Sequence, residues 1–173
     1  MFRNSVGNWR LMMAAAVMLG LAACGNDSSK APATADPVQT IPGPIVDNVP
    51  EGVPPGSDVE FSQIVGNTVL FATDAHDLAS EAQTILQRQA GWLLQYPAWT
   101  AVIKGHADER GTREYNLALG ERRAESVRAY LIALGVDSAR LQTISYGKEQ
   151  PICGEANETC WQGNRRAITA LNP

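Results

Sequence analysis

The sequence predicts an α/β (α+β) fold in which helices pack on one face of a small mixed sheet, as a two-layer sandwich. The first observation is the order of apolar patterns over residues 60–173, which runs strand, helix, strand, helix, strand, strand. The second is the length of this region, which suffices for one hydrophobic core. The third is a proline-rich stretch before it, which separates the domain from the N-terminus.

Four short apolar runs are expected as strands, and two longer periodic segments as helices. The strands are expected at residues 65–71, 100–104, 141–146 and 166–171. The first helix spans about 78–93, with Ser80 as a plausible N-cap. The second spans about 117–134 and has apolar or small residues at steps of three and four until Gly135 ends it.

The composition excludes some classes of partner. The 173 residues are 45% hydrophobic and 18% charged, with a formal net charge of −4. Arg3 and Arg10 are the only charged residues of segment 1–23, so its removal makes the chain more acidic still. Nucleic acid is not an expected partner, because phosphate contacts require a basic patch.

The N-terminus is typical of a bacterial lipoprotein signal. Two arginines precede an apolar run at 11–23, which is too short to span a membrane and ends in Leu-Ala-Ala before Cys24. This pattern resembles the lipoprotein signal family, and the resemblance implies cleavage of residues 1–23 and lipidation of Cys24. Gly25 follows in place of an inner-membrane retention aspartate. We therefore expect an outer-membrane lipoprotein that faces the periplasm; a plain secretory signal is the alternative.

Residues 24–59 form the predicted linker. Seven of the ten prolines of the chain lie in this segment, where they disfavour helices and central strands. The length suits a tether between a membrane surface and a nearby structure. A tail without a spacing function is the other interpretation.

Two polar loops, at residues 73–77 and 105–112, each follow a predicted strand and precede a helix. Such junctions form crevices in which ligands commonly bind. Asp108 would offer an acceptor there, and Arg123 a planar fork of donors. Asn116 lies two turns from Arg123 on the same helix face. An ammonium and a carboxylate on one carbon would suit such a pair of side chains.

The segment GHADERGTREYNLALGERRA at residues 105–124 resembles the signature of the OmpA C-terminal-like family. The similarity continues to residue 171 and begins near residue 67, with its spacing intact. Two positions depart from the pattern of close relatives. Arg113 stands where proline is frequent, and Ala72-Thr73 replaces a more aromatic pair.

The resemblance implies non-covalent binding of peptidoglycan through meso-diaminopimelate of the stem peptide. By position, Asp108 corresponds to the contact of the ligand's amino group and Arg123 to the contact of its carboxylate. Asp74 corresponds to a further wall residue, and Asn116 to a residue that orients the loop. The resemblance also implies the Tol components of the envelope as partners, including the periplasmic β-propeller protein TolB, with roles in envelope integrity and cell division.

Other interpretations remain open from the residues alone. Asp108 and Arg123 could form a purely structural ion pair. His106, Asp108 and His76 give a weak metal-site pattern, and we expect no metal and no cofactor. A wall-cleaving enzyme would need opposed carboxylates or an activated nucleophile, and we expect no enzyme. A general envelope lipoprotein that acts as an adhesin or assembly component is the main alternative function.

Cys153 and Cys160 enclose six residues before the last predicted strand. In an oxidising periplasm we expect them to form a disulfide. Free thiols are the alternative.

Overall fold

The computed structural model describes residues 52–172. The predicted signal peptide, the lipidation site Cys24 and most of the predicted linker lie outside these residues. No helix among the described residues is long and apolar enough to cross a membrane.

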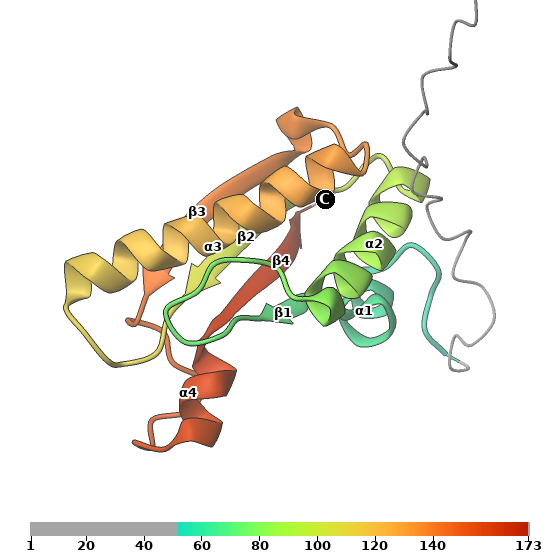
Figure 1. Cartoon of the computed structure of the whole chain (residues 1–173). Coiled ribbons are helices and arrows are strands. Elements are labelled where there is room, and N and C mark those ends of the chain that lie inside the picture. The colour runs from blue at the N-terminus through green and yellow to red at the C-terminus, as the bar shows by residue number, and fades with distance from the viewer. Residues whose placement is uncertain (1–51, 173) are drawn as a thin grey trace, which may run out of the picture. The chain divides into compact units, whose positions relative to one another are not determined.

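Four strands form one mixed sheet in the order β1-β4-β2-β3 (Figure 1). Strand β4 lies antiparallel to both β1 and β2, whereas β2 and β3 are parallel. The parallel pair is joined by a crossover helix, as parallel strands require. The strands are Thr68–Leu70 (β1), Thr100–His106 (β2), Leu141–Gly147 (β3) and Arg166–Asn172 (β4).

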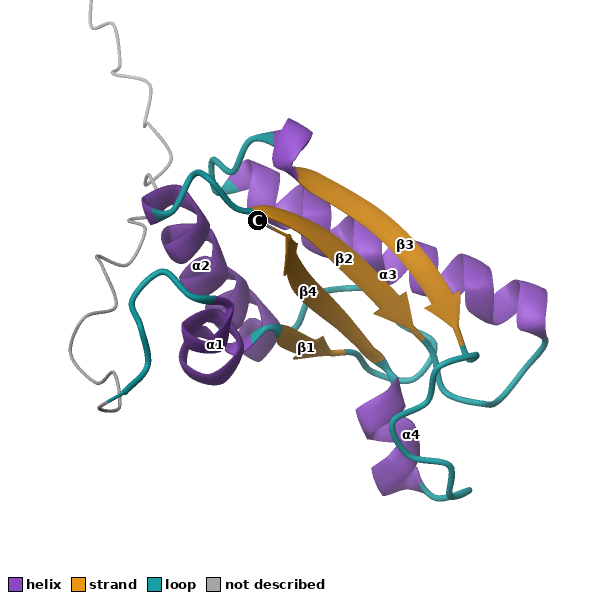
Figure 2. Cartoon of the chain, turned by 180° about the vertical axis from the view of Figure 1, so that it is seen from behind, coloured by secondary structure: helices purple, strands orange, loops and turns teal. Residues whose placement is uncertain are grey.

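The two long helices confirm the predicted helix positions. Helix α2 spans Ser80–Gln95 and α3 spans Arg113–Ala133. Helix α3 lies behind β2 and β3 in Figure 2, so one face of these strands is covered by it. The predicted cap differs: Ala79 precedes α2 and gives it no side-chain cap. Gly135 follows α3 with φ of 99°, a conformation that suits glycine and ends the helix.

Four short segments were not predicted from the sequence pattern. They are α1 (Asp58–Glu60), a π-helical segment η1 (Phe61–Gly66), a 3₁₀ turn η2 (Ser138–Arg140) and α4 (Glu158–Asn164). The first predicted strand is therefore wrong in its N-terminal part, because residues 65 and 66 belong to η1. An apolar run of that length does not distinguish a strand from a buried helical turn.

The hydrophobic core lies between the helices and the sheet. Alternate residues of the strands point into it, including Val69, Ala101 and Ile103, as the period of two requires. Helices α2 and α3 supply Leu86, Leu93, Val127 and Leu131 among others. Leu117, which was predicted on the apolar stripe of α3, is instead 46% exposed.

Two glycines allow α3 to approach the sheet closely. A Cβ atom on Gly105 of β2 would overlap the carbonyl oxygen of Gly120 in α3. A Cβ atom on Gly120 would overlap the hydroxyl of Ser145 in β3. The first half of α3 and the loop before it are therefore held at a fixed distance from the ends of β2 and β3.

Residues just before position 60 already contact the folded region. The indole N–H of Trp92 donates to buried Glu60 at 2.7 Å, and the backbone N–H of Gly56 donates to the same carboxylate oxygen at 2.7 Å. Trp99 donates to the carbonyl of Gly56 at 3.0 Å. The domain boundary at residue 60 stays a prediction.

Cys153 and Cys160 form a disulfide, as expected. Asn164 at the end of α4 fixes the same segment, because its side chain accepts from the Ile152 N–H at 2.9 Å and donates to the Cys153 carbonyl at 2.7 Å. The segment before β4 thus presents α4 at the edge of the domain where β2 ends (Figure 2).

Candidate functional site

A cavity of about 300 Å³ opens where the loop after β1 and the loop after β2 meet the first turns of α3. It brings together all four ligand-binding residues predicted from the sequence. The residues that line it are Thr73, Asp74, Asp108, Arg110, Gly111, Tyr115, Asn116, Leu119 and Arg123.

Local interactions hold the loop between β2 and α3 in place. Thr112 caps α3 by accepting from the backbone N–H of Tyr115 at 3.2 Å. The side chain of buried Asn116 donates to the Arg110 carbonyl at 2.7 Å. Lys148 donates to the Gly111 carbonyl at 2.7 Å and to the Glu109 carbonyl at 3.1 Å. Asn116 therefore ties this loop to the first turn of α3, and its role in ligand binding stays a prediction.

Arg123 projects from α3 and connects this helix to two other backbone segments, the loop after β1 and the end of β2. Its guanidinium donates to the carbonyls of Ala75 at 2.8 Å, His106 at 2.8 Å and Ala72 at 3.1 Å. It also lies over the ring of Phe71, 5.1 Å from the centroid. These contacts fix both loops of the cavity relative to α3.

The charge of Arg123 has no carboxylate partner within salt-bridge distance among the described residues. Burial lowers the pKa of Arg123 to about 10, although the charge of Asp108 acts in the opposite direction. The guanidinium remains charged at neutral pH. A buried cation whose hydrogen bonds go only to carbonyls favours an anion nearby.

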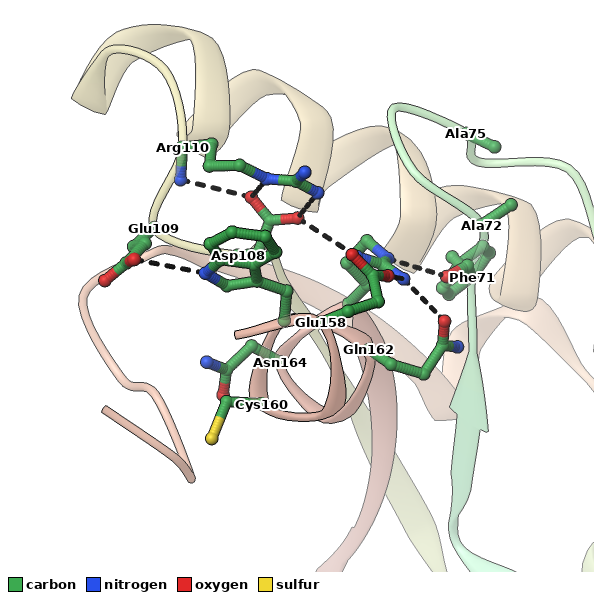
Figure 3. Close-up of polar contacts among 12 residues, drawn as sticks. Phe71, Ala72, Ala75, Asp108, Glu109, Arg110, Glu158, Cys160, Gln162 and Asn164 are labelled. Atoms are coloured by element: carbon green, nitrogen blue, oxygen red, sulfur yellow. Dashed lines mark hydrogen bonds and ion pairs between the residues drawn. The ribbon is translucent and has the colours of Figure 1, made fainter. Parts of the chain in front are cut away.

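Asp108 follows β2 and is paired with two other arginines (Figure 3). Arg110 donates from Nη2 to Oδ2 at 2.6 Å and from Nε to Oδ1 at 3.2 Å. Arg165 donates from Nη1 to Oδ2 at 3.3 Å. Burial raises the pKa of Asp108, but the hydrogen bonds from Arg110 and Arg165 outweigh that effect, so the pKa is lowered.

Asp74 lies on the opposite wall and has a positive φ of 58°, which aspartate tolerates better than most residues. The hydroxyl of Tyr115 donates to its carboxylate. This hydrogen bond raises the pKa of Tyr115. The contact joins the loop after β1 to the first turn of α3 beside Arg123.

Asp108 and Arg123 were predicted to offer an acceptor and a fork of donors to a ligand in one crevice. Both residues line one cavity, but the ion pairs of Asp108 are with Arg110 and Arg165. The exposed fraction of Arg123 is 0%, so it forms the bottom of the cavity beneath the other lining residues. The structural ion pair that was weighed as an alternative is likewise not formed.

Sequence reasoning missed Arg110, Arg165, Tyr115 and Trp161 as parts of this region. Arg165 is buried and bonds to the Phe71 carbonyl, Glu158 and Gln162 besides Asp108. The signal was the pair Arg165-Arg166 at the start of the last strand. Trp161 comes from α4, which the pattern did not reveal. Its ring lies 4.4 Å from Cζ of Arg110, and its indole N–H donates to Glu109 at 3.1 Å (Figure 3).

His106 lies at the end of β2 with 2% of its surface exposed. Neither ring nitrogen of His106 has a hydrogen-bond partner among the described residues. Instead the ring stacks on Tyr146, with centroids 5.4 Å apart. Burial, together with the charges of Arg166 and Lys104, lowers the pKa of His106 to about 4. The described residues contain no group of three His, Cys, Asp or Glu side chains that could hold a metal ion.

The residues that line the cavity lie in a part of the chain that matches a known protein family. The OmpA family matches residues 70–165, which include all the residues that line the cavity. The peptidoglycan-associated lipoprotein of Mesorhizobium japonicum is 45% identical over 162 residues, which are 94% of this chain and 91% of that protein. The peptidoglycan-associated lipoprotein of Rhizobium meliloti is 52% identical over 117 residues, covering 68% of this chain and 66% of that protein.

A solved structure agrees with this assignment. The peptidoglycan-associated lipoprotein of Burkholderia pseudomallei has 38% sequence identity and a TM-score of 0.63, and the match covers 66% of this chain and 98% of that one. The long match in sequence and the agreement in fold lead to one conclusion: the chain belongs to the OmpA family and, within it, to the peptidoglycan-associated lipoproteins.

Proposed function

We propose that the protein binds peptidoglycan non-covalently through the free amino-acid end of meso-diaminopimelate in the stem peptide. The observation that carries this proposal is the buried, charged guanidinium of Arg123, whose partners are carbonyls only, in a cavity that also contains the Asp108 carboxylate. An α-amino acid end carries one anion and one cation. Among the charged groups that line the cavity, Arg123 is opposite in sign to the ligand's carboxylate and Asp108 to its ammonium.

The hydrogen-bonding capacity of Arg123 supports its role in binding a carboxylate. A guanidinium has five N–H donors, and three donate to carbonyls here, which leaves two. A carboxylate accepts two parallel bonds from such a fork. Tyr115 and Arg110 line the same cavity, and both have exposed side chains.

The chemistry of the cavity favours recognition without catalysis. Its two carboxylates belong to Asp74 and Asp108. A general acid requires a raised pKa, whereas the pKa of Asp108 is lowered by its arginine partners. Asp74 is engaged by the hydroxyl of Tyr115. A protein that released muropeptides from isolated cell walls would contradict this part of the proposal.

The second part of the proposal concerns location and partners. Lipids on Cys24 would hold the protein in the outer membrane, facing the periplasm, and the cavity would hold the cell wall. The lipoprotein names of the relatives support the anchor. By resemblance we include TolB and other Tol components as partners, with a role in envelope integrity and division. If cross-linked cells yield no complex with TolB, the alternative of a general envelope lipoprotein, an adhesin or assembly component, gains support.

Asp108→Asn tests the binding site, because it keeps the shape of the side chain and removes its charge. We expect the dissociation constant for the tripeptide L-Ala-γ-D-Glu-meso-diaminopimelate to rise about tenfold or more, as is typical when a hydrogen bond between charged groups is lost. Titration calorimetry on the full-length protein in detergent measures this change.

Glu149→Gln is the matched control, because Glu149 is an exposed carboxylate that pairs with Arg113 outside the cavity. Near-ultraviolet circular dichroism establishes that each variant is folded. Equal affinity of the Asp108 variant and the control would reject Asp108 as the ammonium site.

A further inference from the structure

All acceptor positions of the Asp108 carboxylate are occupied in this structure. Oδ1 accepts from the backbone N–H of Arg110 at 3.1 Å and from its Nε at 3.2 Å. Oδ2 accepts from Arg110 Nη2 at 2.6 Å and from Arg165 Nη1 at 3.3 Å. A carboxylate offers about four lone-pair sites. An incoming ammonium therefore finds no free acceptor on Asp108 until one donor leaves.

Two of these donors are fixed. The side chain of Arg165 is 3% exposed and also bonds to the Phe71 carbonyl, Glu158 and Gln162. The backbone of Arg110 is held through its carbonyl, which accepts from Asn116. Moving either group would break several interactions at once.

The side chain of Arg110 is the donor that can leave. It is 41% exposed, and among the described residues its hydrogen-bond partner is Asp108 alone (Figure 3). Its other contact is the ring of Trp161, at 4.4 Å. Water and this aromatic face can both stabilise a guanidinium that has left the carboxylate.

We propose that the guanidinium of Arg110 is an internal competitor for the ligand's ammonium: it occupies the ammonium position on Asp108 and is displaced when a ligand binds. This inference rests on the proposed function, because it assumes that Asp108 receives an ammonium. The exchange replaces one cation by another. Asp108, whose side chain is 9% exposed, therefore keeps a second cationic partner beside the fixed Arg165 throughout the exchange.

The competition has two consequences for recognition. The apparent affinity equals the intrinsic affinity multiplied by the fraction of molecules in which Arg110 is already displaced, so a small displaced fraction weakens binding. A ligand without an ammonium does not compete with Arg110 for Asp108, so Arg110 does not affect its affinity. Arg110 thus sets the affinity of the site for ligands that carry an ammonium.

The test compares Arg110→Ala and Arg110→Lys with wild type in the full-length protein in detergent. The probe is the tripeptide L-Ala-γ-D-Glu-meso-diaminopimelate, titrated by calorimetry. We expect Arg110→Ala to bind this tripeptide about threefold to tenfold more tightly, because it removes the modestly favoured state in which Arg110 occupies Asp108. Arg110→Lys, which keeps the charge but loses the planar fork, should bind the tripeptide with an affinity between those of wild type and Arg110→Ala.

A second ligand separates competition from a general effect on the site. The second ligand is the same tripeptide with the free amino group of diaminopimelate replaced by hydrogen, so it has no ammonium for Asp108. Its affinity should be the same in wild type and Arg110→Ala. Arg113→Ala is the matched control, because it also removes one arginine charge near the loop, from an exposed pair with Glu149 outside the cavity.

The outcomes distinguish this inference from the proposed function. If wild type binds the tripeptide and Arg110→Ala binds it equally or more weakly, the competitor role is wrong while the proposed function stands. Equal tightening by Arg113→Ala, or tightening for the ligand without the amino group, would also overturn it. If wild type does not bind the tripeptide, both proposals fail together.

Discussion

Arg123 shows why an arginine rather than a lysine suits the bottom of this cavity. Three backbone carbonyls, two from the loop after β1 and one from the end of β2, converge on its planar group. A lysine ammonium is a point charge on a flexible stem and would not match this arrangement. Arg123 therefore serves the fold as well as the proposed site, and its truncation would weaken both.

The buried His106 makes stability depend on pH. Its pKa in the folded state is lowered to about 4 from 6.5, so the unfolded chain binds a proton in this range before the folded chain does. The stability contributed by the neutral ring is present above pH 6.5 and is lost as pH falls toward 4. The loss reaches at most about 3 kcal/mol.

His106→Phe removes this titration and keeps a ring against Tyr146. Urea unfolding at a series of pH values should show that the free energy of unfolding of wild type falls more steeply than that of the variant between pH 6.5 and 4. Parallel curves over that interval would show that His106 is not a source of acid sensitivity.

The contact between α3 and β2 is the most restrictive feature at the level of elements. A Cβ on Gly105 meets the backbone carbonyl of Gly120, which cannot rotate away as a side chain can. We expect Gly105→Ala to lower the free energy of unfolding by about 2–3 kcal/mol, in the range of overpacked cores. Chemical denaturation with tryptophan fluorescence measures this.

Gly154→Ala is the control for that substitution, because a Cβ at position 154 meets no atom within 4 Å. It should leave the midpoint of unfolding almost unchanged. If the Gly105 variant were as stable as this control, the close approach of α3 to the sheet would not limit the fold.

The sequence pattern predicted the elements whose periodicity is long and regular. The positions of α2 and α3 and the mixed sheet followed from the spacing of apolar residues. The short helix α4 did not, because seven residues in a polar segment give too little periodicity. Residues 65 and 66 at the end of η1 fall in the predicted strand 65–71, since Val65 and its neighbours suit either structure.

The candidate site was predictable in part for the same physical reason. The polar loop before the second helix and the helix itself pointed to Asp108 and Arg123, the family resemblance implied Asp74, and the cavity contains all three. Arg165 and Trp161 reach this region from the C-terminal part of the chain. Such long-range contacts depend on how α4 is placed, which local spacing does not determine.

At the scale of the whole molecule, the proposed tether requires a second attachment point outside the described residues. Cys24→Ser would remove the lipid anchor while leaving the cavity intact. We expect the variant to appear in the soluble periplasmic fraction, since without acyl chains the protein has no stable hold on the membrane. Fractionation with immunoblotting measures this. Retention in the outer membrane at the wild-type level would remove the anchor from the proposal.

The central claim is that one cavity recognises an amino-acid end that carries both charges. Co-sedimentation of the full-length protein with isolated cell walls, in the presence of increasing free meso-diaminopimelate or of pimelate, tests it most directly. We expect diaminopimelate to release the protein into the supernatant, and pimelate, which has the carboxylates but no ammonium, to release far less. Equal release by both compounds, or release by neither, would contradict the claim.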